Sequence, residues 1–342
     1  MLQNNRILWV DIAKGIGILL VLIGHISQNQ YISSFIYSFH MPLFFMISGY
    51  LYNNKKNYIK KKIKSILIPY LFFAIISFIY WYCIERNLRE QDVSPINAFI
   101  NIWLARGGNS NYVFNIALWF LPCLLFVEII FHLLQRRIKN NKILSVIIFI
   151  FSIIGYIYAK LNLVRLPLCI DISFTAIAFY FLGYLWRNEC EYYFEKLKLS
   201  KVTKIFIFGI CFLFIAVFSQ FSTNIDMNNL QFPFYICLYI LPIVGFFMIY
   251  IISTVIKQNK ILQYLGNNTL IIMGVHEPIK RIIIELLHRI FKIQTEILRV
   301  NFIWIILTTI VLLLVCLPII YIINNYLPFL IGRKKEKRNV TN

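Results

Sequence analysis

Three ionisable residues, Asp11, Lys14 and His25, stand in one strongly apolar stretch near the N-terminus. A helix advances about 100° and 1.5 Å per residue, so Lys14 and His25 lie within roughly 20° of one face, with about 16 Å between their backbones. Asp11 precedes Lys14 by three residues and is its neighbour on the same side. Charged groups are costly in a bilayer core, so their alignment predicts a polar path along this helix. The alternative is a structural Asp11–Lys14 pair beside an interfacial histidine.

A second histidine, His40, follows after a short turn in the apolar stretch Phe39–Tyr50. Consecutive spans joined by few residues pack antiparallel, which brings His40 near His25. Two imidazoles in one bundle suit proton transfer near neutral pH. The alternative is a buried His40 whose ring is only hydrogen-bonded. A nucleophilic serine is not expected, because the chain contains no G-x-S-x-G sequence.

The composition indicates that apolar helices carry these residues. The chain has 342 residues, of which 60% are hydrophobic, and its mean hydropathy is +0.72. Soluble domains have about 45–50% apolar residues, so these values indicate a polytopic membrane protein. The net charge of +20 does not indicate nucleic-acid binding, because the basic residues lie mainly in short segments between apolar runs. The seven cysteines form no C-x-x-C pair, which favours packing roles over metal binding.

We predict an all-α fold, a polytopic transmembrane helix bundle of about ten spans of roughly 17–25 residues each. Residues 1–332 are expected to form one integral membrane domain, and residues 333–342 a basic cytoplasmic tail. The first span resembles a signal peptide but lacks a small-residue cleavage site, so we expect it to be retained. The predicted spans are 7–27, 31–52, 65–84, 114–134, 143–160, 169–187, 203–221, 233–256, 262–279 and 301–325.

Short basic segments set the predicted orientation. Segment 53–64 contains six lysines and no acid, and 135–142, 257–260 and the C-terminal tail are also basic. All lie on one side of a ten-span bundle, so both termini are predicted to be cytoplasmic. Segment 280–300 has apolar residues at helical spacing and predicts an interfacial amphipathic helix on the outer side. The long outer connection 85–113 is either a plain connector or a lid that contacts a substrate.

The first two spans also carry motifs that have a known parallel. They contain the sequence Asp11-Ile-Ala-Lys14-Gly15, then ten residues between Lys14 and His25, then the block His40-Met-Pro-Leu-Phe-Phe-Met-Ile-Ser-Gly49. In these features the chain resembles the membrane acyltransferase-3 family, specifically its branch of fucose 4-O-acetylase-like acetyltransferases. Further similar stretches cover most of the chain: Leu118-Trp-Phe-Leu-Pro122, Phe179–Tyr184, and Tyr264–Thr269 leading to His276.

Two departures from the family pattern concern its basic residues. The wider family usually has arginine where this chain has Lys14, although the fucose-acetylase-like branch tolerates lysine. The family also tends to have R-x-x-R after the second span, where this chain has Lys61-Lys62-Ile63-Lys64. Arginine holds phosphate bidentately and lysine acts as a point charge, so phosphate binding is expected to persist with a different geometry.

The resemblance implies an O-acetyltransferase that moves an acetyl or similar group from acetyl-CoA, or another acyl-CoA, to a hydroxyl of a cell-envelope sugar or polysaccharide. Both direct transfer and an acyl-enzyme route remain open. The expected partners are an envelope glycan or glycolipid acceptor and membrane lipids, without nucleic acid, and no metal is expected. The expected location is the bacterial inner (plasma) membrane. The alternative function is a membrane transporter or exporter of glycan or acyl groups.

The catalytic residues implied by the resemblance are His25, His40 and Asp11. His25 is predicted to be the base that takes the proton from the attacking hydroxyl. His40 is predicted to orient the acceptor or to stabilise the oxyanion. Asp11 is predicted to pair with Lys14 or to orient the site.

The binding residues implied by the resemblance lie at the two ends of the bundle. Lys14, Lys61 and Lys64 are predicted to bind the phosphates of acyl-CoA from the cytoplasmic side. His276 and Glu277, at the outer end of the ninth predicted span, are predicted to bind the acceptor. The alternatives are that the basic loop only sets the topology and that His276 and Glu277 form an interfacial pair.

Overall fold

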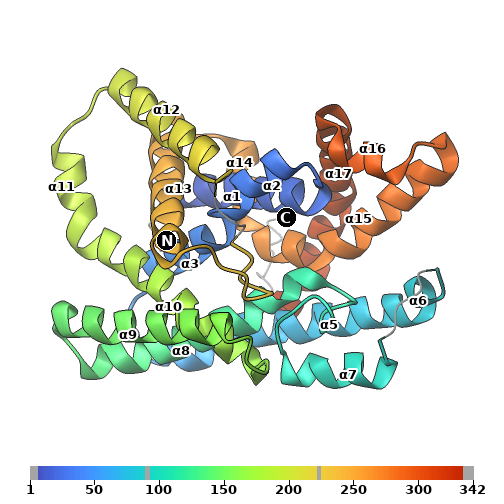
Figure 1. Ribbon diagram of the computed structural model, residues 1–342, viewed down its shortest axis with the longest axis horizontal. Helices are drawn as coiled ribbons and strands as arrows, with labels where there is room; N and C mark the ends of the chain where they lie inside the picture. The colour runs from blue at the N-terminus through green and yellow to red at the C-terminus, as the bar shows by residue number, and fades with distance from the viewer. Residues whose placement is uncertain (1–6, 89–92, 222–224, 334–342) are drawn as a thin grey trace, which may run out of the picture.

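The structure, a computed structural model, describes residues 7–88, 93–221 and 225–333, and this part of the chain is almost entirely helical (Figure 1). Within it, the β-type pairing is an isolated bridge between Asp226 and Gln231. The predicted all-α fold is therefore confirmed. The predicted tail, 333–342, lies outside the described residues except for Arg333. The helices are α1 Leu8–Ile26, α2 Gln30–Tyr37, α3 His40–Tyr50, α4 Tyr58–Lys62, α5 Ile68–Tyr80, α6 Arg86–Leu88, α7 Pro95–Leu104, α8 Phe120–Arg137, α9 Asn141–Lys160, α10 Ile170–Leu185, α11 Glu191–Lys196, α12 Lys201–Phe218, α13 Tyr235–Ile256, α14 Lys260–Asn267, α15 Thr269–Phe291, α16 Thr295–Val300 and α17 Phe302–Tyr326.

Nine helical stretches of the described residues are long and apolar enough to cross a membrane. They correspond to nine of the ten predicted spans. The exception is 262–279, which the structure divides between α14 and α15 at Asn268. Here α15 continues to Phe291, through much of the segment predicted as a separate interfacial helix, 280–300. The segment is thus in part a continuation of α15, in which Lys280 and Arg281 pair inside the bundle while Glu285 and Arg289 form an exposed pair. Its position at a membrane surface stays a prediction.

Polar caps begin many of these helices. Asn29 caps α2 by accepting hydrogen bonds from the N–H groups of Tyr31 and Ile32, and Asn301 does the same for the first turn of α17. Asn140, Ser200 and Asn259 cap α9, α12 and α14. Such side chains satisfy N–H groups that have no partner within the helix. These capping residues therefore mark, in the sequence, where the five helices begin.

Helix α1 lies in the interior of the bundle, where it packs against α3, α13, α14 and α15 (Figure 1). Its contact with α14 is unusually close. A side chain on Gly15 would collide with the backbone of Leu262, and one on Gly266 would collide with the backbone carbonyl of Asp11. Small residues allow helix backbones to approach in this way. The first half of α1 is therefore held rigidly, with Lys14 beside the contact.

A second pair of glycines joins α3 to α10. A Cβ on Gly49 would collide with the carbonyl of Tyr180, and a Cβ on Gly183 would collide with the carbonyl of Met46. Each helix therefore contributes one glycine to a reciprocal backbone contact. The contact fixes α3, whose first residue is His40.

The close packing predicts opposite effects for two similar substitutions. Gly183→Ala is expected to destabilise the protein by at least the roughly 1–3 kcal/mol of ordinary overpacking, because backbone atoms cannot move aside easily. Gly209→Ala in α12 meets open space and is expected to raise stability slightly, since alanine favours the helix by about 0.5–1 kcal/mol. Thermal unfolding of both variants in detergent checks this. Equal melting temperatures would contradict the packing described for α3 and α10.

Candidate active site

A cavity of about 700 Å³ follows one face of α1 through the bundle. Lys14, Ile18, Val21 and His25 all line it, which is the pattern of a single helix face. The predicted stripe from Lys14 to His25 therefore exists and faces the cavity. A volume of this size is typical of small-molecule sites, which lie between roughly 300 and 1,000 Å³.

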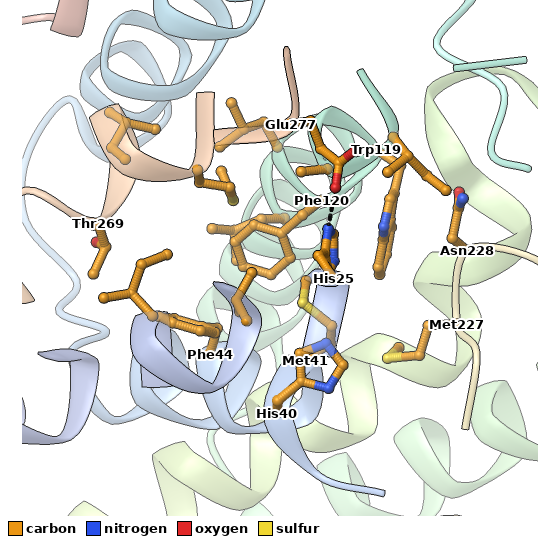
Figure 2. A pocket seen from close by; sticks show the side chains of 18 of the residues that line it. His25, His40, Met41, Phe44, Trp119, Phe120, Met227, Asn228, Thr269 and Glu277 are labelled. Carbon is orange, nitrogen blue, oxygen red and sulfur yellow. Dashed lines mark hydrogen bonds and ion pairs between the residues drawn. The ribbon is translucent and has the colours of Figure 1, made fainter. Parts of the chain in front are cut away.

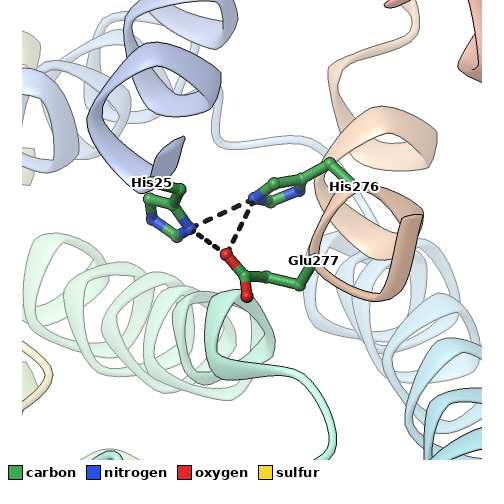
Figure 3. A group of neighbouring side chains, drawn as sticks. All are labelled: His25, His276 and Glu277. Atoms are coloured by element: carbon green, nitrogen blue, oxygen red, sulfur yellow. Dashed lines mark hydrogen bonds and ion pairs between the residues drawn. The ribbon is translucent and has the colours of Figure 1, made fainter. Parts of the chain in front are cut away.

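His25 is held by a carboxylate from a distant helix. Its Nδ1 lies 2.6 Å from Oε1 of Glu277 on α15 and 3.2 Å from Nε2 of His276 (Figure 3). The Nδ1 of His276 lies 3.0 Å from the carbonyls of Ile272 and Met273, so it carries the proton and donates. The Nε2 of a neutral His276 is then an acceptor. Both partners of His25 Nδ1 are thus acceptors, and Nδ1 must be the protonated nitrogen.

This arrangement leaves the other ring nitrogen of His25, Nε2, as a proton acceptor. Figure 3 shows that Nε2 points away from both Glu277 and His276, and the His25 side chain lines the cavity. A histidine whose Nδ1–H is held by a carboxylate keeps the correct tautomer for general-base catalysis at Nε2. The geometry thus supports the predicted role of His25 and supplies a partner that the sequence did not reveal.

Two cations compensate the buried carboxylate of Glu277, whose side chain is 1% exposed. Lys280 Nζ lies 2.6 Å from Glu277 Oε1, and Lys280 also donates to the backbone carbonyl of His25 at 3.2 Å. Arg281 Nη2 lies 3.5 Å from Glu277 Oε2, while its Nη1 donates to both carboxylate oxygens of Glu85 at 2.9 Å. An unpaired buried charge is costly, so these partners make the position of Glu277 possible.

The same three side chains offer the ligand set of a metal site. One ligand atom from each of His25, His276 and Glu277 lies within 4.8 Å of the others. However, the Lys280 ammonium already lies 2.6 Å from the carboxylate oxygen that a cation would need. The cluster is therefore better described as a hydrogen-bonded base than as a metal centre.

His40 lies on the same cavity and is 1% exposed (Figure 2). Its Nδ1 donates to the carbonyl of Ile36 at 2.9 Å. Since a neutral imidazole has one N–H, its Nε2 is an acceptor. A neutral His40 can therefore accept a hydrogen bond from a hydroxyl but cannot donate one to an oxyanion.

Near the turn between α3 and α4, the cavity wall carries lysines, serines and one buried acid. Lys14, Ser48 and Ser65 line the cavity there, together with Lys62 and Glu128. Lys62 Nζ lies 2.7 Å from Oε1 of Glu128, while no hydrogen bond reaches Oε2 of Glu128 from the described residues. This end therefore offers ammonium groups, hydroxyls and a carboxylate oxygen to a ligand.

Four of the predicted residues, Asp11, Lys61, Lys64 and His276, do not line the cavity. Lys61 and Lys64 are exposed, and Lys62 between them faces the cavity instead. Asp11 is 8% exposed and lies beside the contact of α1 with α14. The sequence did not single out Lys62, Lys280 or Arg281 as site residues. Lys280 and Arg281 follow Glu277 by three and four residues, a spacing that puts them on the same face of a helix.

Comparison with known proteins agrees with the family resemblance of the sequence motifs. A sequence model of the acyltransferase 3 family, described as an acyltransferase domain, matches residues 7–322. Nodulation protein NolL of Mesorhizobium japonicum is 31% identical over 209 residues, 54% of this chain and 50% of NolL. NolL of Sinorhizobium fredii is 48% identical over 59 residues, 14% of this chain and 16% of NolL. The chain thus spans half or less of the length of these curated relatives. No solved structure matches.

The pairing of Glu277 with Lys280 predicts strong coupling in stability. Removing either partner alone is expected to cost about 3–5 kcal/mol, and the double variant Glu277→Ala/Lys280→Ala much less than the sum, because no charge is then left unpaired. Unfolding free energies from detergent titration measure this. The exposed pair Glu285–Arg289 on the same helix is the control, with an expected coupling of about 0.3–0.5 kcal/mol. Similar couplings for both pairs would contradict a buried, compensated Glu277.

Proposed function

The chain belongs to the acyltransferase 3 family and is a membrane acyltransferase, and we propose that it moves an acetyl or similar acyl group from an acyl-CoA to a hydroxyl of a cell-envelope sugar. The observation that carries the proposal is the hydrogen bond between His25 and Glu277 at the cavity wall. A hydroxyl is a weak nucleophile, and a carboxylate-oriented imidazole is a group that can activate it.

The proposed reaction uses His25 twice. The acceptor hydroxyl attacks the carbonyl carbon of the thioester while His25 Nε2 takes its proton. The imidazolium that forms is stabilised by Glu277, 2.6 Å from Nδ1. The carbon–sulfur bond then breaks, and the leaving thiolate takes the proton from Nε2. The products are the sugar ester and free coenzyme A, and His25 returns to its neutral form.

Acyl-CoA is proposed to enter at the lysine-rich end of the cavity. The positive-inside rule predicts that the basic loop 53–64, and with it this end, faces the cytoplasm, where acyl-CoA is found. Lys14 and Lys62 line this end and suit phosphate or carbonyl oxygens. The exposed Lys61 and Lys64 are proposed to meet the nucleotide outside the cavity. Lys14 and His25 are about 16 Å apart along α1, which leaves room for the extended pantetheine arm.

The acceptor is proposed to be a sugar of an envelope glycan or glycolipid, in line with the fucose-acetylase-like motifs of the first two spans. His40 is proposed to accept a hydrogen bond from a neighbouring hydroxyl of the acceptor, since its Nε2 is an acceptor on the same cavity. Glu277 is proposed to position His25, and His276 to complete the hydrogen-bonded cluster around His25. Direct binding of the acceptor by His276 and Glu277 is not part of this proposal.

The decisive experiment is transfer of labelled acetyl from acetyl-CoA to membrane glycan. His25→Ala is expected to lower kcat by about 10²–10⁴-fold, because the base is removed. His288→Ala, at the exposed end of α15, is the matched histidine control and should keep full activity. Folding of both variants is checked by size exclusion. Full transfer by a folded His25→Ala variant would overturn the base assignment, and vesicle uptake without acylated product would favour a transporter.

The lysine end gives a separate prediction. Lys14→Ala is expected to raise the KM for acetyl-CoA by about tenfold, equivalent to 1.4 kcal/mol, while Lys14→Arg keeps the positive charge and changes the KM little. Initial rates at varied acetyl-CoA concentration measure this. Equal losses in both variants, or an unchanged KM for acetyl-CoA, would count against a phosphate contact at Lys14.

A further inference from the structure

Two loops, one before the 3₁₀ helix η3 (Ile116–Trp119) and one before α13, are joined by asparagine side chains at one end of the cavity. Oδ1 of Asn228 accepts a hydrogen bond from the N–H of Gly108 at 2.8 Å. Oδ1 of Asn109 accepts hydrogen bonds from the side-chain amides of Asn228 at 3.0 Å and Asn229 at 2.9 Å. Asn109 and Asn228 also line the cavity. The loops therefore present a fixed polar wall to whatever the cavity holds.

This wall keeps hydrogen-bonding groups available. The side-chain NH₂ of Asn109 donates no hydrogen bond within the described ranges 7–88, 93–221 and 225–333, and one amide proton of Asn228 is accounted for by Asn109. The carboxylate of Asp226 accepts from the backbone and side chain of Asn229 and also lines the cavity. A carboxylate has about four lone-pair sites, so it can accept more. Hydrogen-bond donors and acceptors thus lie close together on this wall of the cavity.

The aromatic ring of Trp119 forms the adjoining wall. Figure 2 shows it between the imidazole of His25 and the side chain of Asn228, and it is 5% exposed. Its helix η3 is anchored by Asn115, whose side chain donates to Ser77 Oγ at 3.1 Å and to the carbonyl of Gly274 at 2.8 Å. Gly274 lies on α15, the helix of Glu277. The indole ring of Trp119 is therefore held in a fixed position relative to His25.

A pyranose ring has the matching surface. Its C–H groups form an apolar face that fits an aromatic face, and its hydroxyls point outward from the ring edge towards donors and acceptors. We propose that Trp119, Asn109, Asn228 and Asp226 form a sugar subsite that holds the acceptor ring against the indole and places one hydroxyl at His25. This inference rests on the proposed function, and it assigns the acceptor to the end of the cavity opposite Lys14 and Lys62.

The chemistry of this wall fits a sugar better than the other parts of the reactants. An acyl chain placed there would leave the buried amide of Asn228 without a further partner, which costs free energy. The phosphates of acyl-CoA find ammonium groups at the Lys14 end. Beside His25 the cavity is also lined by Lys280 and Arg281, but both already pair with carboxylates, and Asp226 would repel phosphate. A sugar hydroxyl can both donate and accept, so it satisfies amides and carboxylate together.

The test uses the full-length protein in lipid nanodiscs, labelled acetyl-CoA, and as acceptor the unacylated envelope glycan extracted from cells that lack the gene. Trp119→Ala is expected to raise the apparent KM for the glycan about tenfold or more, with the KM for acetyl-CoA unchanged, because only acceptor binding is lost. Trp119→Phe keeps an aromatic face and should raise it less. Trp103→Ala, an exposed tryptophan of α7 outside the cavity, is the matched control with wild-type kinetics.

Asn109→Ala provides the second variant, since Asn109 is exposed and its loss threatens folding least. It is also expected to raise the KM for the glycan alone. If Trp119→Ala does not fold, Asn109→Ala decides the question. Unchanged glycan KM in the folded variants, or a matching rise in the KM for acetyl-CoA, overturns the subsite while the proposed function stands. No transfer by the wild-type protein overturns the proposed function itself.

Discussion

The arrangement of this bundle depends on one partly buried hydrogen bond, from Nδ1 of His25 to Glu277. It joins α1 to α15 across 252 residues of sequence. Glu277 can be buried only because Lys280 and Arg281 follow it on the same helix and because Glu85 in turn partners Arg281. Rotating or sliding α15 would separate Arg281 from Glu85 and Glu277 from His25, in a medium of low dielectric constant. The hydrogen bond therefore fixes both the orientation of the imidazole and the position of a whole helix.

The glycine contacts provide the frame around this hydrogen bond. Gly15 and Gly266 hold the first half of α1 against α14, and Gly49 and Gly183 hold α3 against α10. Backbone contacts of this kind leave little freedom, because no flexible side chain lies between the helices. Lys14, His25 and His40 are thereby kept at fixed separations along one cavity. A site for transferring a group between two molecules needs such fixed distances.

The cavity wall differs in chemistry from one end to the other. Near the turn between α3 and α4 it carries Lys14, Lys62 and Glu128, and at the other end it carries asparagines and Trp119. The first set suits an anionic, thread-like molecule, and the second suits a ring with many hydroxyls. His25 lies on the cavity between these two ends, where the donor and the acceptor would meet. This division agrees with the proposal that donor and acceptor approach from opposite sides of the membrane.

The sequence alone determined the all-α fold, the nine stretches of the described residues that are long and apolar enough to cross a membrane, and the shared face of Lys14 and His25. These properties are local, since they follow from apolar composition and from the period of one helix. The approach of His40 to the same cavity also followed, because a short turn leaves few alternatives. That α15 continues into 280–300 did not follow from the sequence, since the pairing of Arg281 with Glu85 is not a local property.

Only the tertiary structure decided which groups meet. Glu277 was recognised as a candidate, but its contact with His25 depends on the packing of α15 beside α1. Lys62 of α4 faces the cavity and pairs with Glu128 of α8, whereas Lys61 and Lys64 are exposed, and this choice depends on how α4 packs against α8. Asp11 lies on the predicted side of α1, but α14 packs against α1 at that position, so Asp11 does not line the cavity. Asn109 and Asn228 come from loops whose positions no helical period describes, because loop contacts are set by the elements they join.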